Sequence, residues 1–268
     1  MIDTHCHLDL DVFNPDIAAV IERAQRQGVT KFVIPAIDPQ HWQRQYHLAS
    51  IHPSVFFTLG YHPFFLAPLL AQHSVTSLLD TLRTQWFECQ SSALQSQCLG
   101  FGEIGLDRSI AVPLAQQEAM CLGQLRIAQT LQQPVILHHR KSHDRLLGLI
   151  RQAGFTQGGI IHAFSGSVEV AQAYIKAGFM LGIGGTITYP RGSKTRQTLA
   201  EVGLAHCVLE TDSPDMPMSG RQGLRNEPAH LVDVVQCMAQ LFAMSSDVIC
   251  AQTTANALQV FPRLSVTV

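Results

Sequence analysis

Histidines and carboxylates recur in this sequence directly after short apolar runs, at positions where they can meet and do chemistry. His5 and His7 follow the first run, and their i, i+2 spacing places both side chains on one face of an extended segment while Cys6 points away. Later runs are ended or followed by His62, Glu103, His138, His162 and Asp212. One histidine at such a position is most often a core or loop residue. A set of imidazoles and carboxylates is costly to bury without a cation, so the pattern predicts a metal site.

The apolar runs alternate with longer amphipathic stretches along the whole chain. The expected strands are Met1–Thr4, Lys31–Pro35, Val55–Gly60, Cys98–Gly102, Val135–Leu137, Gly159–His162, Met180–Ile183 and Cys207–Glu210. Helical patterns between them include Ile17–Gln27, Gln116–Leu131, Val168–Ala177 and Ala229–Met244. Eight strand–helix units predict an α/β fold, a closed (β/α)₈ TIM barrel that forms a single domain over residues 1–268. A doubly wound open sheet is the alternative, but it normally has a glycine-rich loop where His5 and His7 stand.

In such a barrel the C-terminal ends of the strands meet at one mouth, so six candidate ligands are expected in one pocket. Four imidazoles and two carboxylates exceed the needs of one tetrahedral ion and suit two ions that share a carboxylate. No lysine stands at the end of the fourth strand, so Glu103 is the predicted bridge. We assign His5, His7, Glu103 and Asp212 to one ion, and Glu103, His138 and His162 to the other.

The motifs that carry these residues occur in a fixed order. They are Asp3-Thr4-His5-Cys6-His7, Gly60-Tyr61-His62-Pro63, Gly102-Glu103-Ile104-Gly105-Leu106-Asp107, Leu137-His138-His139-Arg140, His162-Ala163-Phe164-Ser165-Gly166 and Glu210-Thr211-Asp212. Together they resemble the TatD family of metal-dependent hydrolases, from residue 2 to about residue 261. The segments 184–190 and 193–196 look more like a YjjV-type branch of that family.

The resemblance implies a barrel, two divalent metal ions and a deoxyribonuclease or related phosphodiesterase activity. The expected ions are Mg²⁺, Mn²⁺ or Zn²⁺, which accept mixed imidazole and carboxylate ligands. The sequence departs from the family pattern in two places: Arg108-Ser109 stands where an aromatic residue is usual, and His139 where a serine is common. Both departures bear on substrate preference rather than on metal binding.

The catalytic residues expected from this pattern are Asp212, as the group that orients a water and takes its proton, and Glu103, as the shared ligand. His62, Arg140 and Arg191 are the predicted substrate contacts. The planar guanidinium of Arg140 suits a phosphate, and a salt bridge to a nearby acid is the alternative. His62 has the alternative role of capping its loop.

Other polar and aromatic residues near the expected mouth of the barrel have more than one possible role. Asp3, Glu210 and Asp107 are candidates for holding the ligand imidazoles, with no basis for a choice among them. The glycine-rich segment 219–226, which contains Arg221 and Arg225, is a candidate lid. Phe64 and Phe65 can stack on a base or pack beneath their loop. The histidines in helices and connecting loops are expected at the surface: His41, His47, His52, His73, His143, His206 and His230.

The charge balance of the chain argues against a long DNA duplex as the substrate. The net charge is −2, with only four lysines among the 18 basic residues, whereas proteins that grip long duplex DNA usually carry a broad basic face. We therefore expect action on DNA ends or short single strands. The alternative is an amidohydrolase-type enzyme that cuts C–N or carboxylic-ester bonds of a small molecule, because the same ions can polarise a carbonyl group. A barrel that binds metal without catalysis is the least favoured class.

The seven cysteines are dispersed without a C-x-x-C pair, which suggests reduced thiols. No secretory signal and no run of about 18 apolar residues are present, so we expect a cytoplasmic protein that does not contact a membrane. A monomer is the expected state.

Overall fold

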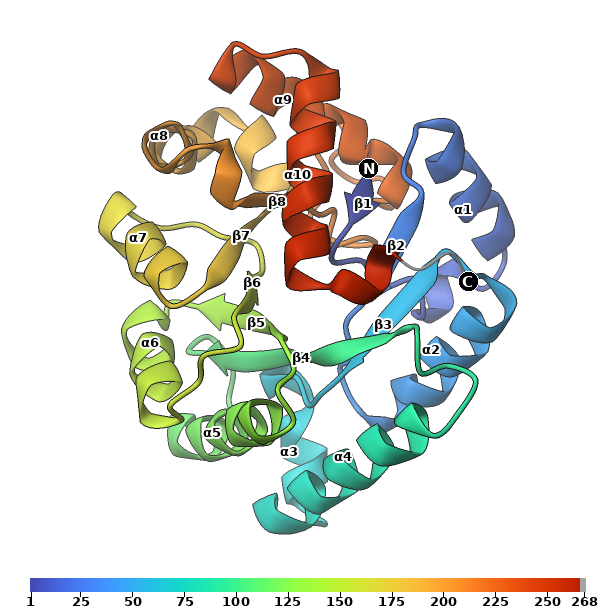
Figure 1. Cartoon of the computed structure of the whole chain (residues 1–268), viewed down its shortest axis with the longest axis vertical. Coiled ribbons are helices and arrows are strands. Elements are labelled where there is room, and N and C mark those ends of the chain that lie inside the picture. The colour runs from blue at the N-terminus through green and yellow to red at the C-terminus, as the bar shows by residue number, and fades with distance from the viewer. Residues whose placement is uncertain (266–268) are drawn as a thin grey trace. The chain divides into compact units, whose positions relative to one another are not determined.

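Eight strands form one sheet, ordered β1 to β8 as they follow along the chain (Figure 1). They are β1 (Ile2–Asp3), β2 (Lys31–Ile34), β3 (Val55–Leu59), β4 (Cys98–Asp107), β5 (Val135–Arg140), β6 (Gly159–Ile161), β7 (Phe179–Ile183) and β8 (Cys207–Leu209). The pairs β1–β2, β3–β4, β4–β5 and β7–β8 are parallel. The computed structural model, which describes residues 1–265, is thus the predicted TIM-type α/β barrel. The doubly wound sheet is excluded.

Helices connect successive strands. They are α1 (Ile17–Arg26), α2 (Pro39–Ile51), α3 (Leu66–Leu70), α4 (Val75–Gln90), α5 (Leu114–Thr130), α6 (His143–Gln152), α7 (Val168–Lys176), α8 (Ser193–Val202), α9 (Leu231–Phe242) and α10 (Ser246–Val260). Short 3₁₀ turns include η1 (Asp11–Phe13), η2 (Pro63–Phe65), η3 (Gly185–Thr188), η4 (Pro190–Gly192) and η6 (Pro228–His230). Side chains cap several helix starts, as Asp38 does for α2 and Ser74 for α4. Among residues 1–265 no single helix is long and apolar enough to span a membrane, although the bent pair 228–242 and 246–260 passes that test jointly.

The chain divides into two compact units, which we call the first unit (residues 1–34 and 160–265) and the second unit (residues 35–159). In the first unit, β1 and the end of β8 lie side by side: Thr4 N donates to Leu209 O at 2.9 Å, and Asp212 N donates to His5 O at 2.9 Å. These backbone bonds bring two predicted ligands together from opposite ends of the sequence. The assignment of residues 1–268 to a single domain stays a prediction.

In the second unit, β4 and β5 extend beyond the predicted strands. Gly105 pairs with His138 and Asp107 with Arg140, so both strands continue past the positions where they were expected to end. A glycine is required at position 105, where φ is +152° and a Cβ atom would lie 2.0 Å from His138 O. Glu103 and His138 therefore lie within strands rather than after them, a correction to the sequence-based placement.

The strands are buried on both faces, as expected for a barrel wall covered by helices. All residues of β3 and β4 are buried, and Phe101 packs against Trp86 of α4 with ring centroids 4.9 Å apart. A phenylalanine buried in this way stabilises the fold by about 1.5–3 kcal/mol. The rigid strands thus hold the polar groups at their ends in place.

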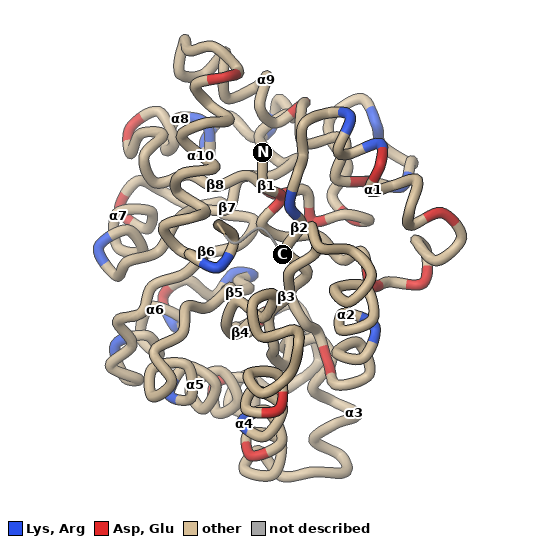
Figure 2. The backbone as a smooth tube through the Cα atoms, turned by 45° about the vertical axis from the view of Figure 1, so that its right-hand side comes forward, with Lys and Arg blue, Asp and Glu red and all other residues tan. Residues whose placement is uncertain are grey.

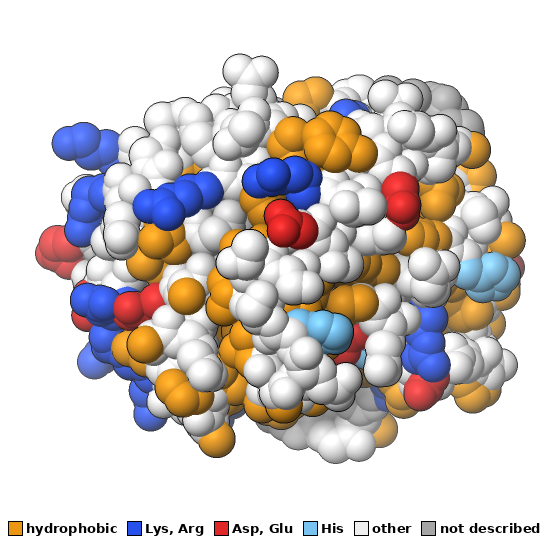
Figure 3. All heavy atoms as spheres, turned by 90° about the horizontal axis from the view of Figure 1, so that it is seen from below, with side chains coloured by type: hydrophobic (Ala, Val, Ile, Leu, Met, Phe, Trp, Pro, Cys, Tyr) orange, Lys and Arg blue, Asp and Glu red, His pale blue; other side chains and the backbone are white. Residues whose placement is uncertain are grey.

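Charged side chains are spread over many elements. Figure 2 shows Lys and Arg on several helices and loops, interleaved with Asp and Glu. On the face drawn in Figure 3, basic side chains alternate with acidic and hydrophobic ones rather than forming one continuous basic surface. Several arginines are also paired, as Arg145 is with Glu118 at 2.7 Å and Arg108 with Asp144 at 3.1 Å.

Candidate metal centre

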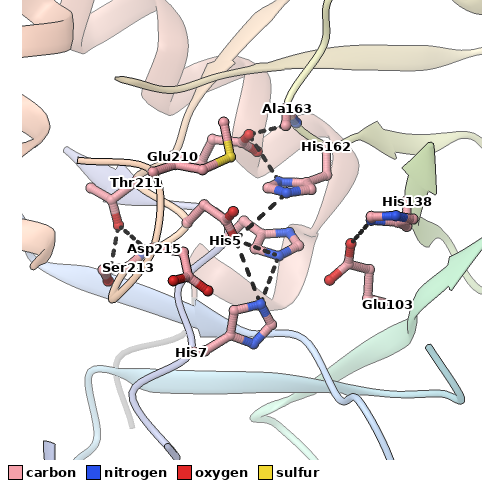
Figure 4. Close-up of polar contacts among 12 residues, drawn as sticks. His5, His7, Glu103, His138, His162, Ala163, Glu210, Thr211, Ser213 and Asp215 are labelled. Atoms are coloured by element: carbon pink, nitrogen blue, oxygen red, sulfur yellow. Dashed lines mark hydrogen bonds and ion pairs between the residues drawn. The ribbon is translucent and has the colours of Figure 1, made fainter. Parts of the chain in front are cut away.

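Three imidazoles of the first unit surround one carboxylate oxygen. The Nε2 atoms of His5, His7 and His162 lie 3.5, 3.6 and 3.6 Å from Oδ1 of Asp212. The Nε2 atoms of His5 and His7 are 3.2 Å apart, and the rings of His5 and His162 stack with centroids 3.5 Å apart. Figure 4 shows the three rings turned toward one another. We call these four residues the Asp212 cluster.

The spacing of these donor atoms fits a divalent cation. Most of the separations are too long for good hydrogen bonds. Ligands held tetrahedrally about 2.1 Å from a metal ion lie about 3.4 Å from each other, which is close to the values in the Asp212 cluster. Buried imidazoles crowded around a carboxylate thus have the chemistry and the spacing of a coordination shell.

The pKa values of Asp212 and His162 are shifted mainly by burial and by neighbouring charged groups. Burial raises the pKa of Asp212, but His162, His5 and His7 outweigh that effect and lower it to about 2. Burial lowers the pKa of His162, but the carboxylates of Glu210 and Asp212 raise it well above its ordinary value. Asp212 is therefore an ionised carboxylate at neutral pH, as a metal ligand must be.

Glu210 orients His162. Its Oε1 lies 2.9 Å from Nδ1 of His162 and accepts a hydrogen bond from Ala163 N at 2.7 Å. The carboxylate is 1% exposed and lies against Gly182 of β7, where a Cβ atom would be 2.2 Å from Oε2. With Nδ1 engaged by Glu210, the Nε2 atom of His162 faces Asp212. A carboxylate behind an imidazole in this way is a common support for a metal ligand.

Asp3 has a different task, because it holds backbone rather than an imidazole. Its Oδ1 accepts from Thr211 N at 3.0 Å and from His5 N at 3.3 Å, and its Oδ2 accepts from Thr211 Oγ1 at 2.6 Å. Burial raises the pKa of Asp3 to about 8, against the opposing effect of the Thr211 hydrogen bonds. Asp3 thus ties the start of the chain to the segment that carries Asp212.

A second set of donors lies in the second unit. Oε1 of Glu103 is 2.8 Å from Nδ1 of His138 and 3.5 Å from Nε2 of His62, and the two rings meet edge to face at 4.3 Å. Donor atoms of all three residues lie within 4.8 Å of one another, so this set also fits a metal ion. We call His62, Glu103 and His138 the Glu103 cluster.

Asp107 supports the Glu103 cluster from behind His138. Its Oδ2 lies 3.4 Å from Nε2 of His138, while its Oδ1 accepts from Ser109 N at 2.7 Å and from Ser109 Oγ at 2.6 Å. Burial raises the pKa of Asp107, but these hydrogen bonds from His138 and Ser109 outweigh it and lower the pKa well below its usual range. Ser109, one of the departures from the family pattern, therefore fixes the acid that contacts His138.

The structure places His62 and His162 differently from the sequence-based assignment. His62 was predicted as a substrate contact; its Nδ1 accepts from Phe64 N at 3.1 Å and caps η2, which leaves Nε2 facing Glu103. His162 was assigned with Glu103 and His138, but in the structure it lies against His5 and Asp212 of the Asp212 cluster. The ligand assignments and the bridging role of Glu103 stay predictions.

The two predicted arginine contacts are exposed. Arg140, at the end of β5, forms no ion pair with any residue in 1–265, so the alternative of a salt bridge is not realised. Arg191 lies over the ring of Tyr189 at 4.6 Å. Arg196 instead donates to Ile187 O at 2.6 Å and to Tyr189 O at 2.7 Å, so it holds its own loop.

The glycine-rich segment proposed as a lid is tied to its surroundings. Arg225 donates to Asp16 at 2.8 Å, and Arg221 donates to Asp233 at 2.7 Å. Asn226 donates to Thr211 O at 2.9 Å. These two arginines are therefore occupied, and the segment is better described as a strap than as a lid.

All seven histidines expected at the surface are exposed or half-buried, and His230 in addition has a structural role. It forms a capping box with Glu227 at η6, and its Nδ1 lies 3.0 Å from Asn226 Oδ1. Burial lowers the pKa of His230, which favours its neutral form.

Comparisons with known proteins identify the family of this chain. The model of the family described as TatD related DNase matches residues 2–262. The uncharacterized metal-dependent hydrolase YjjV of Escherichia coli (strain K12) is 36% identical and aligns over 97% of both chains. The deoxyribonuclease TATDN3 of Homo sapiens is 28% identical, over 98% of this chain and 95% of that one.

Solved structures show the same fold. The crystal structure of YjjV from Escherichia coli has a TM-score of 0.88 at 35% identity, covering 98% of both chains. A hydrolase of the TatD family from Entamoeba histolytica has a TM-score of 0.81 at 20% identity, covering 97% of both chains. The family model, the relatives and the buried imidazole–carboxylate clusters lead to one assignment. This chain belongs to the TatD family of metal-dependent hydrolases.

Proposed function

We propose that this protein is a deoxyribonuclease that hydrolyses phosphodiester bonds at DNA ends or in short single strands, using two divalent metal ions. The observation that carries the proposal is the Asp212 cluster, in which three imidazoles face one ionised carboxylate oxygen at 3.5–3.6 Å. Each of the two clusters is proposed to hold one ion. The deoxyribonuclease activity named for the human relative supports DNA as the substrate.

The residues have distinct proposed roles. A bound divalent cation supplies charge stabilisation for the phosphoryl group and makes water easier to deprotonate. Asp212 orients the attacking water and accepts its proton, for which its ionised state is required. The exposed guanidinium of Arg140 binds a non-bridging phosphate oxygen. Glu210 and Asp107 keep the rings of His162 and His138 in the orientation that presents their nitrogens.

One comparative assay tests the proposal. The metal-free protein is reconstituted separately with Mg²⁺, Mn²⁺ and Zn²⁺ and incubated with an aryl phosphodiester, with 3′- and 5′-labelled oligonucleotides, and with a panel of amides and lactones. We expect metal-dependent cleavage of the phosphodiesters, and the labelled ends distinguish removal of terminal nucleotides from internal cuts. Turnover confined to amides or lactones would establish the alternative carbonyl chemistry and refute the nuclease.

A further inference from the structure

A separate pocket of about 480 Å³ lies in the second unit, between the start of α2 and the elements η2, α3 and α4. Its volume is within the range of sites that hold small organic ligands. Tyr61, Phe65 and Leu69 are among the side chains that line it, together with the polar residues Gln40 and Gln72. None of these residues belongs to the Asp212 or Glu103 cluster, so the metal site does not account for the pocket.

The buried hydroxyl group of Tyr61 lacks a hydrogen-bond partner among the described residues. Tyr61 is 1% exposed. The rest of the residue is firmly held, because Gln124 bonds its backbone N and O at 2.8 and 3.2 Å and Trp42 packs against its ring at 5.4 Å. Buried polar groups are rarely left without a partner, and Tyr61 is one of the residues that line this pocket.

The lining selects an uncharged, flat ligand. Phe65, Leu69 and Leu78 provide an apolar wall, whereas Gln40 and Gln72 provide amide donors and acceptors. No lysine or arginine is among the lining residues that the structure describes, so a phosphate group is a poor fit. Asp38 is already engaged as the cap of α2, where it accepts from Gln40 N at 2.8 Å. A planar heterocycle with hydrogen-bonding edges, such as a nucleobase, satisfies both parts of the wall.

The pocket adjoins the Glu103 cluster through one aromatic side chain. The ring of Phe65 is 5.9 Å from the ring of His62, which it meets edge-on, and Phe65 also lines the pocket. His62 in turn faces Glu103 at 3.5 Å. A nucleotide bound with its phosphate near His62 therefore has a place for its base on the other side of Phe65.

We propose that this pocket is a nucleobase subsite, in which the hydroxyl of Tyr61 and the amides of Gln40 and Gln72 bind the edge of a base and Phe65 contacts its face. The inference rests on the proposed function, because it assigns the base to the strand whose phosphodiester is cut. It adds that the enzyme requires a base next to the scissile bond, whichever metal is used.

Direct binding tests the pocket without any turnover. The metal-free full chain is titrated with the four deoxynucleosides and with deoxyribose 5-phosphate, which has no base, and binding is followed by NMR or calorimetry. We expect at least one nucleoside to bind and the sugar phosphate not to bind. Tyr61→Phe should weaken nucleoside binding about 3- to 10-fold, the loss of one hydrogen bond, without lowering the melting temperature. Tyr46→Phe removes a hydroxyl that already has a partner, Gln85 at 3.4 Å, outside the pocket and should bind nucleosides as the wild type does.

Cleavage provides the second measurement. Oligonucleotides with an intact or an abasic nucleotide beside the scissile bond are compared by kcat/KM. We expect the wild type to prefer the intact substrate at least tenfold, and Leu69→Trp, which fills the pocket, to reduce that ratio to about one. Equal rates on both substrates, together with no nucleoside binding, would overturn the subsite while leaving the nuclease intact. Nucleoside binding that Tyr61→Phe weakens, without hydrolysis of any phosphodiester, would retain the pocket and refute the proposed function.

Discussion

Asp212 owes its charge state to the side chains around it. Three imidazoles point at its Oδ1 and hold the pKa at about 2 in spite of burial. The backbone of Asp212 has a positive φ of 57°, a conformation that aspartate tolerates better than most residues, and its N–H is bonded to His5 O. Its position is therefore set by the backbone and its charge by the histidines, so a change confined to the carboxylate should spare the fold.

Asp212→Asn keeps the shape of the side chain and removes its charge. We expect kcat on a phosphodiester to fall by about 10²–10⁴-fold, because the base is lost, while the circular dichroism spectrum is retained. Asp80→Asn makes the same chemical change on the exposed face of α4 and should leave kcat unaltered. Rates for Asp212→Asn close to those of the wild type would show that another group takes the proton.

Gly182→Ala tests the support of His162 without touching a predicted ligand. The added methyl group would lie 2.2 Å from Oε2 of Glu210, so the carboxylate must shift from the position in which it contacts His162. We expect metal affinity to fall by about 10–100-fold, as for other losses of a carboxylate behind an imidazole ligand. Gly148→Ala is the control: nothing lies within 4 Å of the new methyl group, and it should stabilise α6 by about 1 kcal/mol. Competition with a chelator measures both affinities, and equal values would contradict the role of Glu210.

Arg140→Ala removes an exposed guanidinium that has no acidic partner among the described residues. If Arg140 binds phosphate, KM for an oligonucleotide should rise about tenfold, and the dependence of KM on salt should weaken. Arg83→Ala removes a comparable exposed arginine from α4 and should change neither quantity. An unchanged KM in Arg140→Ala would remove this residue from the substrate contacts.

At the scale of elements, the strap after β8 is joined to α1 by a chain of ion pairs. Arg225 contacts Asp16 at 2.8 Å, and Arg23 contacts Asp16 at 3.1 Å and Glu227 at 2.7 Å. Exposed ion pairs contribute little when isolated, but a shared network of bidentate arginines is more effective. The network therefore restrains the segment between Asp212 and α9.

The ion pairs of Asp16 with Arg225 and Arg23 should make the folded protein less stable as the pH falls. Hydrogen bonds from Arg225 and Arg23 lower the pKa of Asp16 to about 2 in the folded protein, against about 3.9 in an unfolded chain. A lowered folded pKa means that the stabilisation is complete above about pH 4 and is lost as the pH falls toward 2. Asp16→Asn should therefore melt below the wild type at pH 6 and at nearly the same temperature at pH 2. High salt should narrow the difference at pH 6, and a difference independent of pH would exclude Asp16 as its source.

The starts of several strands could be predicted from the turn residues beside them, whereas the ends of β4 and β5 could not. The strands β2, β3, β4 and β5 begin at Lys31, Val55, Cys98 and Val135, as predicted, because Gly, Pro or a polar turn precedes or bounds each apolar run. The extra length of β4 and β5 comes from pairing across the sheet, which the sequence of one strand does not contain. One helix start also differed from the prediction: α9 begins at Leu231 instead of Ala229, because Pro228 opens a 3₁₀ turn first.

The residues of the candidate site could be predicted from the sequence, whereas the residues that support them could not. The metal-site residues were proposed because each follows or ends an apolar run, which is a local signal. Their supports were left open because they depend on contacts between distant segments: Glu210 with His162, and Asp107 with His138. Ser109 was noted only as a departure from the family pattern, although an aspartate two residues before it is the local signal of a turn in which the carboxylate accepts from the later backbone N.

At the scale of the whole molecule, the charge pattern limits the ways in which the proposed nuclease could bind DNA. The net charge is −2, and many arginines are paired with acids of the same protein. Affinity for a long duplex, which comes mainly from phosphate contacts, is therefore expected to be weak. Recognition by a few local contacts at a strand end agrees better with this distribution.

Metal removal should lower the stability of the first unit. The donors of the Asp212 cluster lie directly after β1, β6 and β8, so an ion bound there joins segments that are far apart in the sequence. A ligand at 100 times its dissociation constant adds about 2.7 kcal/mol, which for a chain of this size corresponds to a rise in Tm of about 5–10 °C. We expect this rise when Mn²⁺ or Zn²⁺ is added to chelator-treated protein in a thermal unfolding experiment, and a clearly smaller one for Asp212→Asn. If no divalent ion raises the melting temperature of the wild type, the crowded imidazoles are held by protein contacts alone and the metal centre is refuted.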